Sequence, residues 1–72
     1  MSEKNVDSRT SHLPRLRVHR KRRALTQMEL AKISGVGRAT IARLEAGGVA
    51  YRSTISKLAR SLKVKPQELI EK

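Results

Sequence analysis

The sequence has no cysteine, tryptophan or phenylalanine, and it has one tyrosine among its 72 residues. The lack of cysteine excludes disulfides and thiolate metal sites. The scarcity of aromatic side chains argues against a protein that binds single-stranded nucleic acid, because such proteins stack bases on aromatic rings. The core must be aliphatic, and a chain of this length holds one small domain, for which compact helical packing is favoured.

Acidic residues are also few. The chain has 17 lysines and arginines against 6 acids, which gives a formal net charge of +11. Residues 1–23 carry a net +6 and residues 24–72 a net +5, so the charge is not confined to a tail. A charge of this size indicates a polyanionic partner. Long apolar runs are absent, so we expect no signal peptide, no membrane segment and a cytoplasmic, nucleoid-associated protein.

The sequence offers no combination of residues typical of an active site or a metal centre. His12 and His19 have neither a cysteine nor a paired histidine at metal-ligand spacing. The stretch GVGR at 35–38 contains two glycines, but no strand precedes it and no third glycine follows at the spacing of a dinucleotide-binding loop. The acidic residues are scattered. We therefore predict that the protein is not an enzyme and needs no cofactor or metal.

The stretch from Leu25 to Glu45, LTQMELAKISGVGRATIARLE, is the most informative part of the chain. It predicts two short helices joined by a glycine turn. Thr26 can cap the first helix, with Glu29 at the position that completes a capping box. Gly35 falls where the turn needs a positive φ, which glycine adopts without steric cost. The second helix is expected from about Gly37 to Ala46.

One face of the helix expected at 37–46 carries only arginine and alanine. At 100° per residue, Arg38, Ala39 and Arg43 fall within an arc of about 140°, together with two further alanines. Ile41 and Leu44 lie on the other side and face a core. Small side chains would let the helix enter a DNA groove, where each arginine could donate two hydrogen bonds to a guanine. A solvated helix face usually mixes glutamate with lysine, so we favour a DNA-reading surface over a solvated one.

The remaining sequence predicts a flexible arm over residues 1–12 and a single domain over residues 13–72. Three further helices are expected: one from about Pro14 to Ala24, one from about Ser53 (its cap) to Leu62, and a short one that Pro66 opens. The fold class is thus all-α, a compact five-helix domain. Its predicted core consists of Leu16, Leu25, Leu30, Ala31, Val36, Ile41, Leu44, Ile55, Leu58, Leu62 and Leu69.

Six short motifs follow one another along most of the chain. They are LTQxELA at 25–31, GV at 35–36, ATIxRLE at 39–45, Gly47, STIxxLA at 53–59 and VxPxEL at 64–69. In this order and spacing, the chain resembles the lambda-repressor-like (Cro or XRE-type) helix-turn-helix family over about residues 14–71. The resemblance implies a five-helix domain whose third helix enters the major groove of DNA.

The resemblance also implies roles for residues of the two central helices. Gln27 matches a glutamine that holds a phosphate and braces the reading helix. Arg38, Ala39 and Arg43 occupy the positions that read base edges, in agreement with the helical face described above. Thr40 lies at the edge of that face and could donate a hydrogen bond to a phosphate.

Outside these helices, Arg20 and Glu45 match a charged pair that ties the first helix to the end of the third in relatives. The pair would be structural. In the loop before the fourth helix, Arg52 is a candidate phosphate contact, and Tyr51 could add its hydroxyl or simply pack against the loop. Arg22, in the basic run of the first helix, could contact a phosphate or belong to a solvated face.

These features together predict a sequence-specific regulator of transcription that binds double-stranded DNA, such as a small bacterial or phage repressor. We expect a homodimer on an inverted repeat with guanines in its arms, and Ile70 could contact the second copy or belong to the core. Two alternatives stay open. One is a protein-interaction module with the same fold, an antitoxin or coactivator with a protein partner, and the other is a non-specific DNA-coating protein.

Overall fold

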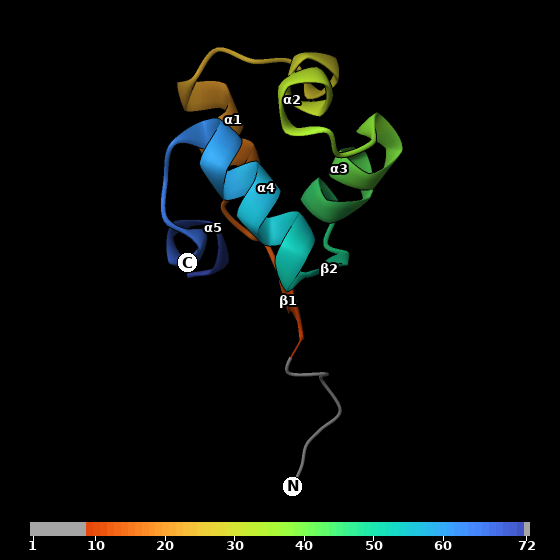
Figure 1. The fold of residues 1–72 in the computed structure, drawn as a ribbon, viewed down its shortest axis with the longest axis vertical. Coiled ribbons are helices and arrows are strands. Elements are labelled where there is room, and N and C mark those ends of the chain that lie inside the picture. The colour runs from red at the N-terminus through yellow and green to blue at the C-terminus, as the bar shows by residue number, and fades with distance from the viewer. Residues whose placement is uncertain (1–8, 72) are drawn as a thin grey trace, which may run out of the picture.

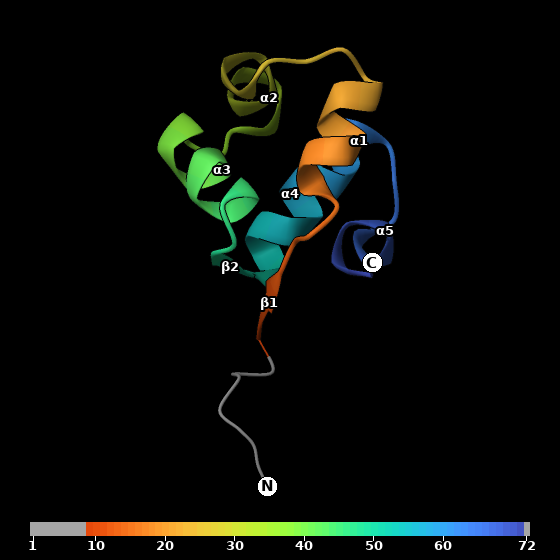
Figure 2. The same cartoon turned by 180° about the vertical axis from the view of Figure 1, so that it is seen from behind.

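The computed structural model describes residues 9–71. The longest helix in this part of the chain, α4 (Arg52–Leu62), runs through the middle of the molecule (Figure 1). The elements in chain order are β1 (Thr10–His12), α1 (Leu16–Arg22), α2 (Gln27–Ser34), α3 (Arg38–Glu45), β2 (Val49–Tyr51), α4 and α5 (Pro66–Ile70). Seen from the front and from behind (Figure 2), α3 lies on one flank of α4 and α5 on the other. The five predicted helices are confirmed.

The start of α2 and the turn after it follow from two local sequence signals. The amide of Glu29 donates to Oγ1 of Thr26 at 3.0 Å, and the amide of Thr26 donates to Oε1 of Glu29 at 2.8 Å, which completes the predicted capping box. Gly35 ends the helix with φ 79°, the left-handed conformation that glycine favours. The chain can therefore turn sharply from α2 into α3.

The core is aliphatic, as the composition requires. Its buried members are Leu13, Leu16, Leu30, Val36, Ile41, Leu44, Ala50, Ile55, Leu58, Ala59, Leu62 and Leu69. Two residues of the predicted core, Leu25 and Ala31, are only partly buried against this cluster, and Ile70 packs against it in the same way. Leu13, Ala50 and Ala59 are buried but absent from the predicted core, and Ala50 lies in a sheet that the sequence did not indicate.

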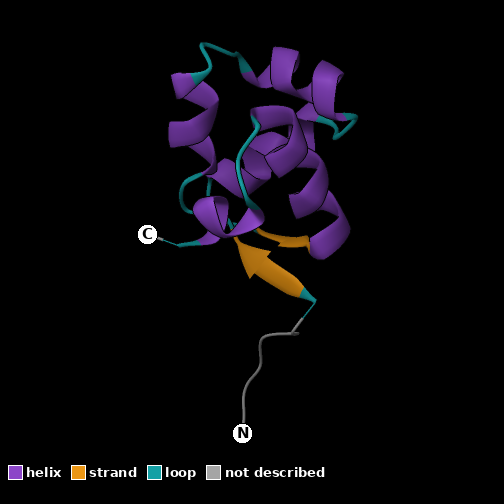
Figure 3. Cartoon of the chain, turned by 60° about the vertical axis from the view of Figure 1, so that its left-hand side comes forward, coloured by secondary structure: helices purple, strands orange, loops and turns teal. Residues whose placement is uncertain are grey.

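That sheet pairs the N-terminal part of the described chain with the loop after α3 (Figure 3). β1 and β2 are antiparallel, with Ser11 opposite Ala50 and His12 opposite Val49. The prediction of a flexible arm over residues 1–12 is therefore wrong for residues 10–12, and residues 1–8 lie outside the described part. A three-residue strand shows no periodicity of its own, and its stability comes from a partner far away in the sequence.

The start of α4 also differs from the prediction. The helix begins at Arg52, and Tyr51 rather than Ser53 is its N-cap residue. Tyr51, the last residue of β2, has an extended backbone conformation with φ −70° and ψ 157°, so the helix can begin directly after the strand. The amide of Arg52 donates to the carbonyl of Arg9 at 3.0 Å. The backbone before β1 thus satisfies a first-turn donor of the helix, and no side-chain cap is formed.

Candidate nucleic-acid interface

The helix α3 has one buried face and one bare face. Ile41 and Leu44 are 0% and 1% exposed and point into the core. Arg38, Ala39 and Arg43 are all exposed on the opposite face, which carries no acidic side chain. Gly37 is the N-cap residue and forms no side-chain cap. The helical face inferred from the sequence is therefore the solvent-facing one, and its role in reading bases stays a prediction.

The charged pair expected between α1 and the end of α3 is present. Nε of Arg20 donates to Oε2 of Glu45 at 2.6 Å, and Nη2 donates to Oε1 at 3.0 Å. The third contact of this guanidinium runs from Nη1 to the carbonyl of Leu25 at 2.6 Å. The side chains of Arg20 and Glu45 are only 10% and 6% exposed. The three hydrogen bonds of the Arg20 guanidinium therefore hold α1, the α1–α2 connection and the end of α3 together.

The same geometry perturbs the protonation equilibria of both groups. Burial alone would raise the pKa of Glu45, but hydrogen bonds from Arg20 and Gln27, with the nearby charges of Arg20 and Arg17, hold the pKa below its usual value. The hydrogen bond with Glu45 raises the pKa of Arg20 in turn. Both groups are therefore charged at neutral pH, as a buried and paired arginine and glutamate should be.

Gln27 connects this pair to the exposed face of α3. Its Nε2 donates to Oε1 of Glu45 at 3.1 Å, and its Oε1 accepts a hydrogen bond from Nη1 of Arg38 at 3.3 Å. The Gln27 side chain at the start of α2 thus links Arg38, the first residue of α3, to Glu45, its last residue. This placement agrees with a bracing role for Gln27, and its contact with a phosphate stays a prediction.

Arg43 is held by the loop that follows α3. Its Nη1 donates to the carbonyl of Val49 in β2 at 3.1 Å. Together with Thr40 and Tyr51, which is 61% exposed, Arg43 lines a hollow of about 260 Å³. The other residues of this hollow are Thr10, Val49, Ala50 and Thr54.

The structure thus brings three of the predicted contact residues together and adds two threonines that the sequence did not single out. Thr10 gave no signal because it lies in a stretch without periodicity and enters the hollow through β1. Thr54 belongs to the motif at 53–59, which by itself assigns it no role. Hydroxyl groups beside an arginine can donate to phosphate oxygens, and a phosphate contact at this hollow stays a prediction.

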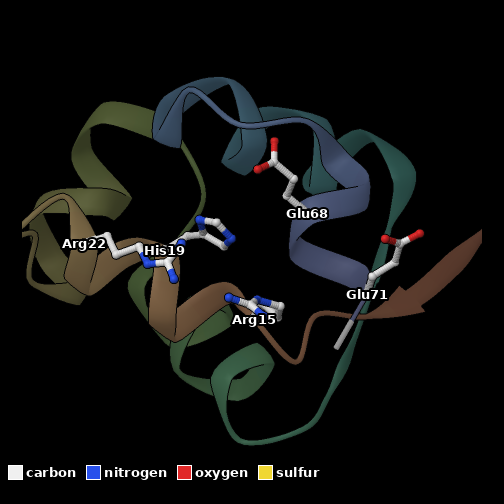
Figure 4. Close-up of a pocket in the computed structure, with 5 residues that line it drawn as sticks. All are labelled: Arg15, His19, Arg22, Glu68 and Glu71. Atoms are coloured by element: carbon white, nitrogen blue, oxygen red, sulfur yellow. The ribbon is translucent and has the colours of Figure 1, made fainter.

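Arg22 lies elsewhere. It lines a hollow of about 200 Å³ between α1 and α5 (Figure 4), where Arg15, His19 and Arg22 face Glu68 and Glu71. The two glutamates make this hollow a poor place for a DNA phosphate, because like charges repel. The structure therefore does not bring Arg22 together with the exposed face of α3, and the solvated alternative is favoured for it.

Arg52 is also separate from the other candidates. It is exposed and lines a different hollow from Arg43, together with residues of β1, α4 and α5, namely Ser11, Ile55, Ser56, Pro66, Gln67 and Ile70. The charge of Arg52 does not predict this placement. The side of α4 on which Arg52 lies depends on the residue at which β2 ends and the helix begins.

Among residues 9–71, no three histidine, cysteine or acidic side chains lie where they could hold a metal ion. Within the same range, no helix is both long enough and apolar enough to span a bilayer.

Comparison with known proteins identifies the class. Residues 16–69 match the sequence model of a helix-turn-helix family, and the chain belongs to this family, of the Cro/C1 type. It is a DNA-binding regulator of transcription and not an enzyme.

The chain is also similar to a protein whose crystal structure is known. The restriction-modification controller protein C.AhdI from Aeromonas hydrophila is similar to this chain, with 37% sequence identity and a TM-score of 0.74. The match covers 78% of this chain and 86% of C.AhdI. No protein of curated function matches the chain.

Proposed function

We propose that the protein is a sequence-specific repressor that reads the major groove of double-stranded DNA with α3. The observation that carries this proposal is the solvent-facing side of α3, where Arg38, Ala39 and Arg43 stand without an acidic neighbour. A helix that is small and basic on its exposed face can approach base edges closely, and no enzymatic or metal-binding role competes for these residues.

The spacing of the two arginines sets what they can read. Arg38 and Arg43 are five positions apart in α3, which corresponds to roughly 7.5 Å along the helix axis. Stacked bases are about 3.4 Å apart, so the two guanidiniums reach bases about two steps apart. Each can donate a bidentate pair to O6 and N7 of guanine, and each such pair discriminates by about 1–3 kcal/mol.

The size of this effect favours a dimer. Two arginine contacts supply about 2–6 kcal/mol of discrimination. Specific regulators prefer their sites over other DNA by about 4–10 kcal/mol. A symmetric homodimer on an inverted repeat doubles the contacts and reaches that range. Ile70, a candidate contact between the two copies, packs against the core of its own chain, which favours the core role for it.

The similarity to C.AhdI favours one class of target. C.AhdI is a restriction-modification controller protein, and we propose that this chain likewise controls genes of a restriction-modification system. The prediction is that its preferred DNA site lies upstream of such genes in the genome that encodes it. A site upstream of a toxin gene would instead favour the antitoxin alternative.

The proposal is tested by selecting binding sites from random duplex DNA, with the affinities of the enriched sequences measured at two salt concentrations. We expect an inverted repeat with guanines in both arms, bound well above background at the higher salt. Arg38→Ala and Arg43→Ala should each abolish the preference at one position per arm. Arg22→Ala removes the same charge far from α3 and is the matched control, which should leave every preference in place.

Three outcomes would contradict the proposal. If no motif is enriched and affinity collapses with salt alone, the protein is a non-specific DNA-coating protein. If the motif survives both Arg38→Ala and Arg43→Ala, α3 does not read the bases through this face. Binding to no DNA, with a protein recovered in stoichiometric amounts from the native host, would support the interaction module.

A further inference from the structure

Gly48 lies directly under the side chain of Arg43. A Cβ atom at this position would be 2.7 Å from Nη1 of Arg43, 3.0 Å from its Cγ and 3.0 Å from its carbonyl oxygen. A real Cβ does not approach another atom as closely as 2.7 Å, so another residue at this position would push the flexible end of the Arg43 side chain aside, and the two contacts at 3.0 Å would be tight. The φ of Gly48 is not in the left-handed region, unlike those of Gly35 and Gly47. Glycine therefore leaves room for the Arg43 side chain where it lies, and the backbone conformation here does not call for glycine.

The Arg43 side chain that passes over Gly48 ends at a hydrogen-bond acceptor. The Arg43 side chain crosses the glycine and reaches the carbonyl of Val49, which accepts from Nη1 at 3.1 Å. A guanidinium has five N–H donors, so this bond leaves four, enough for a bidentate contact with a base. One edge of the guanidinium is thus fixed by the loop while the rest of the fork stays available.

The loop that offers this acceptor is itself anchored. Val49 is paired with His12 in the β1–β2 sheet, and Nδ1 of His12 donates to the carbonyl of Gly47 at 2.8 Å. The amide of Gly48 donates to the carbonyl of Arg43 at 2.9 Å, which ties the loop back to α3. The acceptor of the Arg43 guanidinium is therefore held in place from both sides.

We propose that Gly48 and the Val49 carbonyl position the Arg43 guanidinium for base contact, so that Gly48 sets the specificity of a DNA position that it does not touch. A long side chain loses conformational freedom when it binds, and one that is already held loses less. This inference rests on the proposed function, because it assumes that Arg43 reads a base. It adds a residue of the loop to the determinants of specificity.

The molecule supplies an internal control. Arg38, the other predicted reader, is held by Gln27 and has no contact with the loop at 47–49 among the bonds described above. Disturbing Gly48 should therefore weaken discrimination at the base read by Arg43 and leave the base read by Arg38 unaffected. A general loss of folding would lower both together.

The test compares four proteins on the selected operator and on operators with one base pair changed: the wild type, Gly48→Ala, Arg43→Ala and the double variant. The positions read by Arg38 and Arg43 are assigned first from the sites that each arginine-to-alanine variant selects. We expect Gly48→Ala to lose about tenfold in discrimination at the Arg43 position, equivalent to about 1.4 kcal/mol. In the Arg43→Ala background, Gly48→Ala should have no further effect on discrimination.

A second measurement does not depend on the folding of a variant. The ¹⁵N relaxation of the arginine Nε–H groups in the free wild-type protein reports how ordered each side chain is. We expect Arg43 to be markedly more ordered than the exposed Arg22. Equal mobility of the two would overturn the proposal.

Other results separate the failure of this inference from that of the proposed function. If Gly48→Ala binds the operator as well as the wild type, or more tightly, the Val49 contact is a resting contact that DNA must break, and the positioning role is wrong. If the wild-type protein shows no base preference at all, the proposed function itself fails, whatever Gly48 does.

Discussion

Replacing Glu45 with glutamine should cost the protein a large part of its stability. The substitution keeps the size of the side chain but leaves Arg20 with a buried, unpaired charge, at 10% side-chain exposure. Removing one partner of a buried ion pair typically costs about 3–5 kcal/mol. A domain of this length is stable by about 4–10 kcal/mol in total. The variant is therefore expected to be marginally folded at 25 °C.

Urea unfolding followed by circular dichroism measures the effect. We expect the free energy of unfolding to fall by about 3 kcal/mol or more, and the thermal midpoint to fall by about 15–30 °C. Glu71→Gln makes the same chemical change at an exposed position after α5 and is the matched control. Its effect should stay within about 0.5 kcal/mol.

The reason for the loss can be tested as well. If an unpaired Arg20 is the cause, replacing both Arg20 and Glu45 with methionine should recover part of the stability that Glu45→Gln loses, because two apolar side chains leave no buried charge. A loss below about 1 kcal/mol for Glu45→Gln, or one equal to that of Glu71→Gln, would refute the reasoning. The Arg20–Glu45 ion pair would then contribute no more to stability than an exposed surface ion pair does.

Two further predictions concern pH and helix capping. The pKa of Glu45 is lower in the folded protein than in the unfolded chain, so its stabilising contribution is present above the unfolded pKa of about 4.3 and is lost as the pH falls through the folded pKa. Urea unfolding between pH 7 and pH 3 should show this acid destabilisation in the wild type, and a smaller one in Glu45→Gln. Thr26→Ala removes the α2 cap and should cost about 1 kcal/mol in the same assay, whereas Ser56→Ala, at an exposed position of α4, should change little. An equal effect of the two would contradict the capping argument.

The central part of the fold could be predicted because its signals are local. The capping box of Thr26 and Glu29 and the glycine at 35 depend on residues within one or two turns of each other. The buried side of α3 follows from helical periodicity, which places Ile41 and Leu44 on one face. Family resemblance added the pairing of residues as far apart as Arg20 and Glu45, which periodicity alone does not give.

The parts that were missed depend on contacts between distant segments. β1 exists because Thr10–His12 meet Val49–Tyr51, and neither stretch has a pattern of its own. The burial of Ala50 and the early start of α4 both follow from that pairing. The link between Gly48 and Arg43 was missed for a similar reason: it depends on the path of a loop, which glycine permits but does not determine.

The β1–β2 pairing also has a consequence for the order of folding. It joins segments about 40 residues apart, whereas α2 and α3 are neighbours in the sequence, so the sheet closes a longer loop than the α2–α3 pair does, at a greater entropic cost. Three-residue strands form only a short ladder of backbone hydrogen bonds, and regions of this kind open before the core does. The amides of β1 and β2 should therefore exchange with solvent sooner than those of α4. The Val49 carbonyl that accepts a hydrogen bond from Arg43 would therefore form later than the exposed face of α3 and be lost earlier.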